Sequence, residues 1–70
     1  NKPINSISFK VKNADEVDTL SKMLKKGGDV EVSINVVSSD KAYKVKLKDR
    51  RFIDRKTVNL IKNQGILTTI

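Results

Sequence analysis

The sequence contains no cysteine and no histidine, and it has one proline and three glycines among 70 residues. Without cysteine, disulfides and thiolate metal sites are excluded. Without histidine, the commonest metal ligand and the usual general base are missing. We therefore expect a non-catalytic binding protein that needs no cofactor, no metal ion and no small-molecule ligand.

Long apolar runs are also missing. No segment approaches the roughly 20 residues that a membrane-spanning helix needs, and no signal-peptide pattern opens the chain. We therefore expect a cytoplasmic protein with no membrane partner. A chain of this length is expected to form a single small α+β domain, residues 1–70. Because it begins with Asn1 instead of methionine, we interpret it as a module cut from a longer protein.

The chain is strongly basic, with fifteen Lys and Arg against eight Asp and Glu and a net charge of +7. Such an excess can be an electrostatic footprint for phosphate groups or for an acidic partner surface. A lysine-rich composition can equally reflect AT-rich coding. The charge alone leaves both interpretations open.

Three segments alternate apolar and polar residues, which is typical of strands with one buried face. These segments cover residues 5–12, 29–37 and 42–48. The side chains expected to point into the core are Ile7, Phe9, Val11, Val30, Val32, Ile34, Val36, Tyr43, Val45 and Leu47. The opposite face of the first and third segments consists largely of lysines.

Two helices are expected between the strands. Asn13 and Glu16 have the spacing of a capping box, and the helix that follows is expected to end at Gly27 and Gly28, with Lys22, Lys25 and Lys26 in its last turn. Asp54 is a good N-cap for a second helix over residues 55–63, which Gly65 ends. Residues 66–70 are rich in β-branched side chains and predict a last strand.

The predicted order is β-α-β-β-α-β, preceded by a linker over residues 1–4. Crossover connections are right-handed, so both helices should cover the same face of a four-stranded, mainly antiparallel sheet. We therefore predict a ferredoxin-like, two-layer α+β sandwich. The other face of the sheet is expected to meet water.

Clusters that could be mistaken for active-site chemistry have simpler interpretations. Asp15, Glu16 and Asp18 crowd the first turn of the expected helix, where negative charge compensates the helix dipole. Gly27 and Gly28 follow a helix, whereas a phosphate-binding loop places its glycines before one. No serine or threonine has a partner that would activate it as a nucleophile.

Several segments together resemble the C-terminal domain of the bacterial replicative DNA polymerase III alpha subunit. The resemblance rests on Leu20 and Leu24, on the run Lys26-Gly27-Gly28-Asp29-Val30-Glu31-Val32, on Lys46-Leu47-Lys48, on Arg51-Phe52-Ile53-Asp54 and on Gly65. It covers nearly the whole chain. The resemblance implies an interaction domain at the end of the polymerase that contacts the clamp-loader tau subunit, while polymerase chemistry belongs to other domains of that family.

The candidate interaction surface combines the basic strand face with the corner that follows the third strand. Its residues are Lys10, Lys12, Lys44, Lys46, Lys48, Arg50, Arg51 and Phe52. Two alternatives stay open. The same lysines could give weak, non-specific contact with nucleic acid, although the aromatic residues Phe9 and Tyr43 are expected inside the core, where they cannot stack on bases. A regulatory module that binds a small metabolite at a dimer seam is the other.

Overall fold

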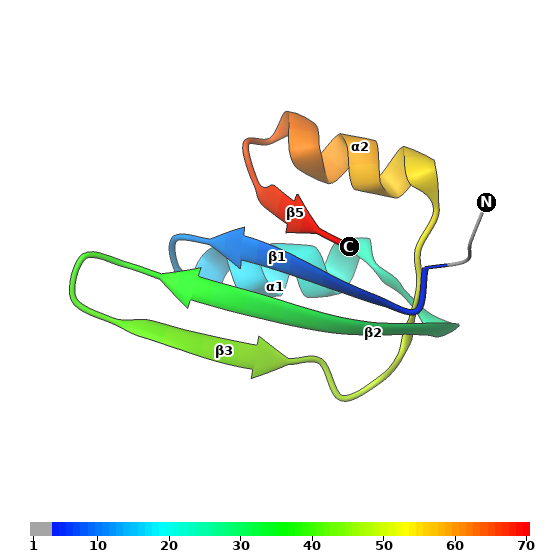
Figure 1. Ribbon diagram of the computed structural model, residues 1–70, viewed down its shortest axis with the longest axis horizontal. Helices are drawn as coiled ribbons and strands as arrows, with labels where there is room; N and C mark the ends of the chain where they lie inside the picture. The colour runs from blue at the N-terminus through cyan, green and yellow to red at the C-terminus, as the bar shows by residue number, and fades with distance from the viewer. Residues whose placement is uncertain (1–3) are drawn as a thin grey trace.

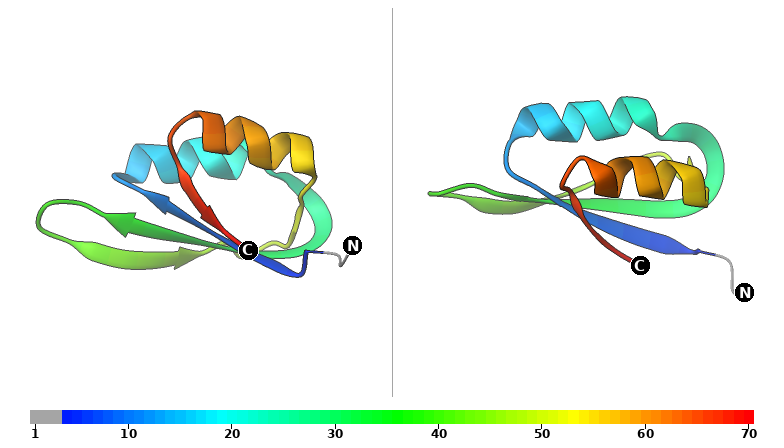
Figure 2. Two further views of the ribbon diagram at one scale, coloured as in Figure 1. Left: turned by 45° about the horizontal axis from the view of Figure 1, so that its top comes forward. Right: turned by 90° about the horizontal axis from the view of Figure 1, so that it is seen from above.

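The computed structural model describes residues 4–70. Its strands are β1 (Ser6–Val11), β2 (Lys25–Val37), β3 (Ala42–Lys46), β4 (Arg51–Phe52) and β5 (Leu67–Thr69), and its helices are α1 (Ala14–Met23) and α2 (Arg55–Asn63). Both helices lie on one face of the sheet and leave the other face bare (Figure 1, Figure 2). The predicted α+β class is confirmed. Of the expected linker, residues 1–3 lie outside the described residues, whereas Ile4 packs against the core.

The strand order differs from the ferredoxin-like prediction. The main sheet runs β3-β2-β1-β5, and the short β4 pairs with the start of β2. β1 and β2 are direct parallel neighbours, whereas a ferredoxin-like sheet is built on a split β-α-β unit. The other pairings are antiparallel. The sheet thus has five strands where four were predicted, because the sequence shows no pattern for the two-residue β4.

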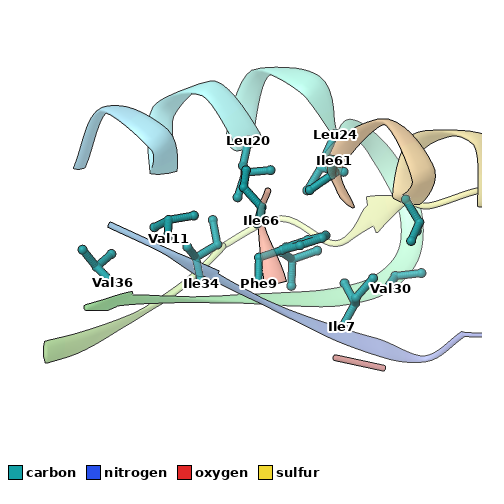
Figure 3. Close-up of a cluster of buried hydrophobic side chains, with 12 residues drawn as sticks. Ile7, Phe9, Val11, Leu20, Leu24, Val30, Ile34, Val36, Ile61 and Ile66 are labelled. Carbon is teal, nitrogen blue, oxygen red and sulfur yellow. The ribbon is translucent and has the colours of Figure 1, made fainter. Parts of the chain in front are cut away.

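Register places the apolar side chains of neighbouring strands side by side on the helix face. Phe9 of β1 lies opposite Ile34 of β2, and Ile7 lies opposite Val32. Figure 3 shows Ile7, Phe9 and Ile34 pointing toward the side of the sheet that carries Leu20 of α1 and Ile61 of α2, and both of these helix residues are fully buried. Burial of apolar area at about 25 cal/mol per Å² is the main force that holds the two layers together.

Tyr43 points to the helix face but is not buried, in contrast to the prediction. It pairs with the buried Val36 of β2 and therefore shares its face, yet 46% of its surface is exposed. The reason is the reach of the helices. The β2–β3 hairpin extends beyond α1 and α2 (Figure 1, Figure 2), so nothing covers this end of β3.

Helix α1 begins where predicted and ends earlier. The Asn13 side chain accepts a hydrogen bond from the backbone N–H of Glu16 at 3.0 Å, and the Glu16 carboxylate accepts one from the N–H of Lys12 at 2.8 Å. The helix stops at Met23, with Leu24 already extended as its C-cap. Lys25 and Lys26 belong to β2 and not to the last helical turn.

The two glycines lie inside β2, so the prediction that they end the helix is wrong. Gly27 has a positive φ of 93°, and the pairing of β2 with β4 shifts register between Lys26 and Val30, which marks a bulge. A Cβ atom on Gly28 would collide with the backbone of Arg51 and Phe52. Glycine is needed here because β4 crosses close to β2, not because a helix ends.

Helix α2 covers the predicted residues and uses the predicted N-cap. The Asp54 carboxylate accepts a hydrogen bond from the N–H of Thr57 at 2.8 Å. This hydrogen bond, with a smaller contribution from the charge of Lys56, holds the pKa of Asp54 below its ordinary value.

The lowered pKa of Asp54 gives an expected pH dependence. A carboxyl group with a depressed folded-state pKa stabilises the fold above its unfolded-state pKa, and this stabilisation is lost as pH falls through the folded-state value. We therefore expect the wild-type domain to lose more stability than Asp54→Asn between neutral pH and pH values below the ordinary carboxyl range. Chemical denaturation over this range measures the difference. Parallel pH profiles for the two proteins would contradict the capping role.

Candidate interaction face

The open face of the sheet displays three of the five predicted lysines, Lys10, Lys44 and Lys46. Lys44 of β3 lies opposite Asn35 of β2, and Asn35 lies opposite Lys10 of β1. The two lysines therefore belong to one row across the sheet, two strand spacings or about 10 Å apart. Lys46 occupies the next row on β3, opposite Ser33. Strand alternation thus gathers cations from two strands on one face, as predicted.

The cations differ in whether a carboxylate neutralises them. Glu31, on the same face of β2, forms ion pairs with two of them: Nζ of Lys46 lies 3.9 Å from one of its oxygens, and Nη2 of Arg50 lies 3.4 Å from the other. Lys10, Lys12 and Lys44 form no ion pair with any of residues 4–70. Lys48, beyond the other end of β3, is likewise unpaired among residues 4–70, so three of the four unpaired candidate lysines lie near the end of the sheet where β2 meets the β2–β3 turn.

Apolar side chains lie beside these unpaired lysines. Leu67 of β5 is the direct neighbour of Lys10, and Val37 is exposed at the end of β2. Together with Lys12 and Gly65 they line a hollow of about 220 Å³ at the surface. We call Lys10, Lys12, Lys44, Val37 and Leu67 the basic-apolar patch. The patch combines charge with exposed apolar surface, and Val37 is the member that was not predicted as a contact residue, because strand alternation does not show that this end of β2 is left uncovered.

The residues predicted at the corner after β3 differ in exposure and in position. Arg50 is exposed and pairs with Glu31, and Lys48 is exposed in the connection after β3. Arg51, in contrast, is only 4% exposed, so its place in the predicted contact surface is a misassignment. Phe52 is 56% exposed on β4, at the opposite end of β2 from the basic-apolar patch.

Arg51 serves the fold. Its Nη1 donates to the backbone carbonyl oxygens of Ser21 at 2.6 Å and Leu24 at 2.7 Å, and its Nε donates to that of Asp49 at 3.2 Å. The last carbonyl groups of a helix have no partner within the helix, and a cation near them also interacts favourably with the helix dipole. Arg51 therefore ties the C-terminus of α1 to β4.

Residues 4–70 contain no group of three or more acidic, histidine or cysteine side chains that could hold a metal ion. None of the helices described there is long and apolar enough to span a membrane. The three acidic residues near the start of α1 have local roles: Glu16 completes the cap, Asp15 precedes it in the first turn, and Asp18 pairs with Lys22 at 3.0 Å. The arrangement of the open face favours binding of a partner with negative charge.

Comparison with known proteins adds no identification. No family model matches the chain, no curated protein matches it, and no solved structure matches its fold.

Proposed function

We propose that this chain is a non-catalytic protein-interaction domain that binds an acidic, partly apolar protein surface through the open face of its sheet. The observation that carries the proposal is the basic-apolar patch, in which lysines without carboxylate partners surround the exposed side chains of Val37 and Leu67. Charge at such a surface sets orientation and encounter rate, and the apolar contacts supply affinity.

The sequence resemblance supplies a specific partner. We propose that the domain belongs to a cytoplasmic DNA polymerase III alpha subunit and contacts the clamp-loader tau subunit. Support comes from the spacing of Leu20, Leu24, the Gly27-Gly28 pair and Gly65 along a chain with two helices, of which the first ends earlier than predicted. The proposal assigns no polymerase chemistry to this domain.

Weak DNA binding is the second candidate. It is favoured by the half-buried hydroxyl groups of Ser8 and Ser33, which lie among the lysines and could donate to phosphate oxygens. Base stacking is not available at the patch, because Phe9 is buried, Tyr43 faces the helix side and Phe52 lies at the far end of β2. The protein partner therefore accounts better for the exposed apolar side chains.

The test is a binding titration with purified tau subunit. We expect the double variant Lys10→Glu/Lys12→Glu to weaken tau binding by about tenfold, because two favourable surface contacts of up to about 1 kcal/mol each become repulsive. The control is Arg55→Glu/Lys56→Glu on α2, an exposed double charge reversal away from the patch that changes the net charge equally, and it should leave affinity nearly unchanged. Equal losses for both variants would show that only net charge matters.

A parallel titration with duplex DNA separates the two candidates. Contact of three lysines with phosphates gives a slope of about −2.7 in a plot of log affinity against log salt. If the domain binds DNA with this slope and does not bind tau, the protein-interaction proposal fails. Binding to tau with a shallow salt dependence supports it.

A further inference from the structure

The outer edge of β3 is a free strand edge. β3 is the last strand of the main sheet and pairs with β2 on one side only. Among residues 4–70, no backbone or side-chain hydrogen bond reaches its other side. A strand edge of this kind presents a row of unpaired backbone groups that a further strand can bond.

Two backbone hydrogen bonds at the ends of the β2–β3 pairing show which backbone groups of β3 face outward. The N–H of Leu47 donates to the carbonyl of Val32 at 2.9 Å, and the N–H of Ser38 donates to that of Lys41 at 2.8 Å. In an antiparallel ladder, bonded and non-bonded pairs alternate. Tyr43 and Val45 therefore bond to β2, while the N–H and C=O groups of Lys44 and Lys46 point away from the sheet.

The side chains along this edge divide by chemistry. Tyr43 and Val45 lie on the helix face, beside the core residues Val36 and Ile34 with which they pair. Lys44 and Lys46 lie on the open face. A strand added at this edge would place alternate side chains against an apolar row and a cationic row.

Charge complementarity indicates which kind of segment can pair with the edge of β3. A second copy of β3 that kept apolar side chains together would set lysine against lysine, which destabilises a strand pair. Nucleic acid has no peptide backbone that could pair with the outward N–H and C=O groups of Lys44 and Lys46. A segment of alternating acidic and apolar residues would place its carboxylates beside Lys44 and Lys46 and its apolar side chains beside Tyr43 and Val45. Its backbone would bond the outward N–H and C=O groups of β3.

We infer that the partner of this domain contributes an extended segment of alternating acidic and apolar residues, which adds to β3 as a further strand. The inference rests on the proposed function and specifies how the partner binds. Glu31 acts as an internal competitor, because it already pairs with Lys46 at 3.9 Å.

The decisive probe is a synthetic peptide of alternating glutamate and valine, measured by isothermal titration against the whole domain. Two further peptides carry N-methyl groups, one on the glutamates and one on the valines. A strand uses the N–H groups of only one set to bond its neighbour. We expect one methylated peptide to lose binding by more than about tenfold and the other to lose far less, consistent with two or more lost hydrogen bonds.

Protein variants separate charge from backbone pairing. Lys44→Gln keeps the outward N–H and should weaken peptide binding by about two- to fivefold, as expected for one exposed ion pair. Lys44→Pro also removes the N–H, which β2 does not use, and should weaken it much further. Glu31→Gln should strengthen binding, by up to about fivefold, because it frees Lys46.

Several outcomes would overturn the inference. Equal losses for the two methylated peptides, a domain dimer that buries β3, or an oligonucleotide that displaces the peptide would each exclude strand addition by an acidic segment. Absence of peptide binding would do the same. If tau nevertheless binds and Lys10→Glu/Lys12→Glu weakens it, the proposed function stands and only the strand-addition mode fails. The titrations of the methylated peptides against the wild-type domain still test the inference if Lys44→Pro does not fold.

Discussion

Replacing Arg51 with methionine is expected to cost the domain about 3–5 kcal/mol of folding free energy, since each hydrogen bond from a charged donor contributes about 1.5–3 kcal/mol. The guanidinium group donates to two carbonyl oxygens at the end of α1, at 2.6 and 2.7 Å. Methionine fills similar space but leaves those oxygens without a donor. For a small domain with a total stability near the lower end of about 5–15 kcal/mol, the variant should be largely unfolded.

The neighbouring arginine is a matched control. Arg50 is exposed and forms only a surface ion pair with Glu31, so Arg50→Met should change stability by no more than about 1 kcal/mol. Arg51→Lys should not restore the wild-type value, because one ammonium group does not reproduce the planar fork that reaches several carbonyls. Urea denaturation followed by circular dichroism measures all three. Similar stabilities for Arg50→Met and Arg51→Met would contradict the structural role of Arg51.

Replacing Gly28 with alanine is expected to be comparably damaging. The added methyl group would collide with the backbone of Arg51 and Phe52. Backbone atoms held by strand pairing cannot move aside as a flexible side chain can, so β4 and β2 must separate. Overpacking of a core costs about 1–3 kcal/mol and occasionally more, and we expect at least about 3 kcal/mol here.

Gly27 supplies the control for this prediction, because it differs from Gly28 in the reason for glycine. A Cβ atom on Gly27 meets nothing within 4 Å, but its φ is +93°. Gly27→Ala should therefore cost about 1–2 kcal/mol from backbone conformation alone. If thermal denaturation shows Gly28→Ala to be no less stable than Gly27→Ala, β4 does not approach β2 as closely as the structure shows.

Features that depend on neighbouring residues could be predicted from the sequence. Asn13 and Asp54 start the two helices because a cap is a contact between residues three positions apart. Alternation fixed the faces of β1, β2 and β3, because side-chain direction in a strand is local. Lys10, Lys44 and Lys46 consequently reached the open face as expected.

Features that depend on distant contacts could not be predicted. Alternation assigns a face but not a neighbour, so the direct pairing of β1 with β2 was missed. Glycine can end a helix or allow two backbones to approach, and only the position of β4 distinguishes these uses at Gly28. Arg50 and Arg51 are adjacent and chemically identical. Which of them is buried depends on where α1 ends.

One weak signal favoured the observed strand order. All four inward positions of β2 are β-branched, and all are buried, as a central strand requires. In β3, Tyr43 and Val45 have the same direction but remain partly exposed. An edge strand with lysines on its other side is also a common device against unwanted strand pairing. This contrast indicates that β3, not β2, lies at the edge.

An NMR titration of the ¹⁵N-labelled domain with tau subunit tests the proposed binding face most directly. Binding through the open face and the β3 edge predicts that the largest shifts occur at the amides of Lys10, Lys12, Lys44 and Lys46, while those of α1 and α2 change little. Shifts concentrated on the helices, or no shifts at saturating tau, would contradict it.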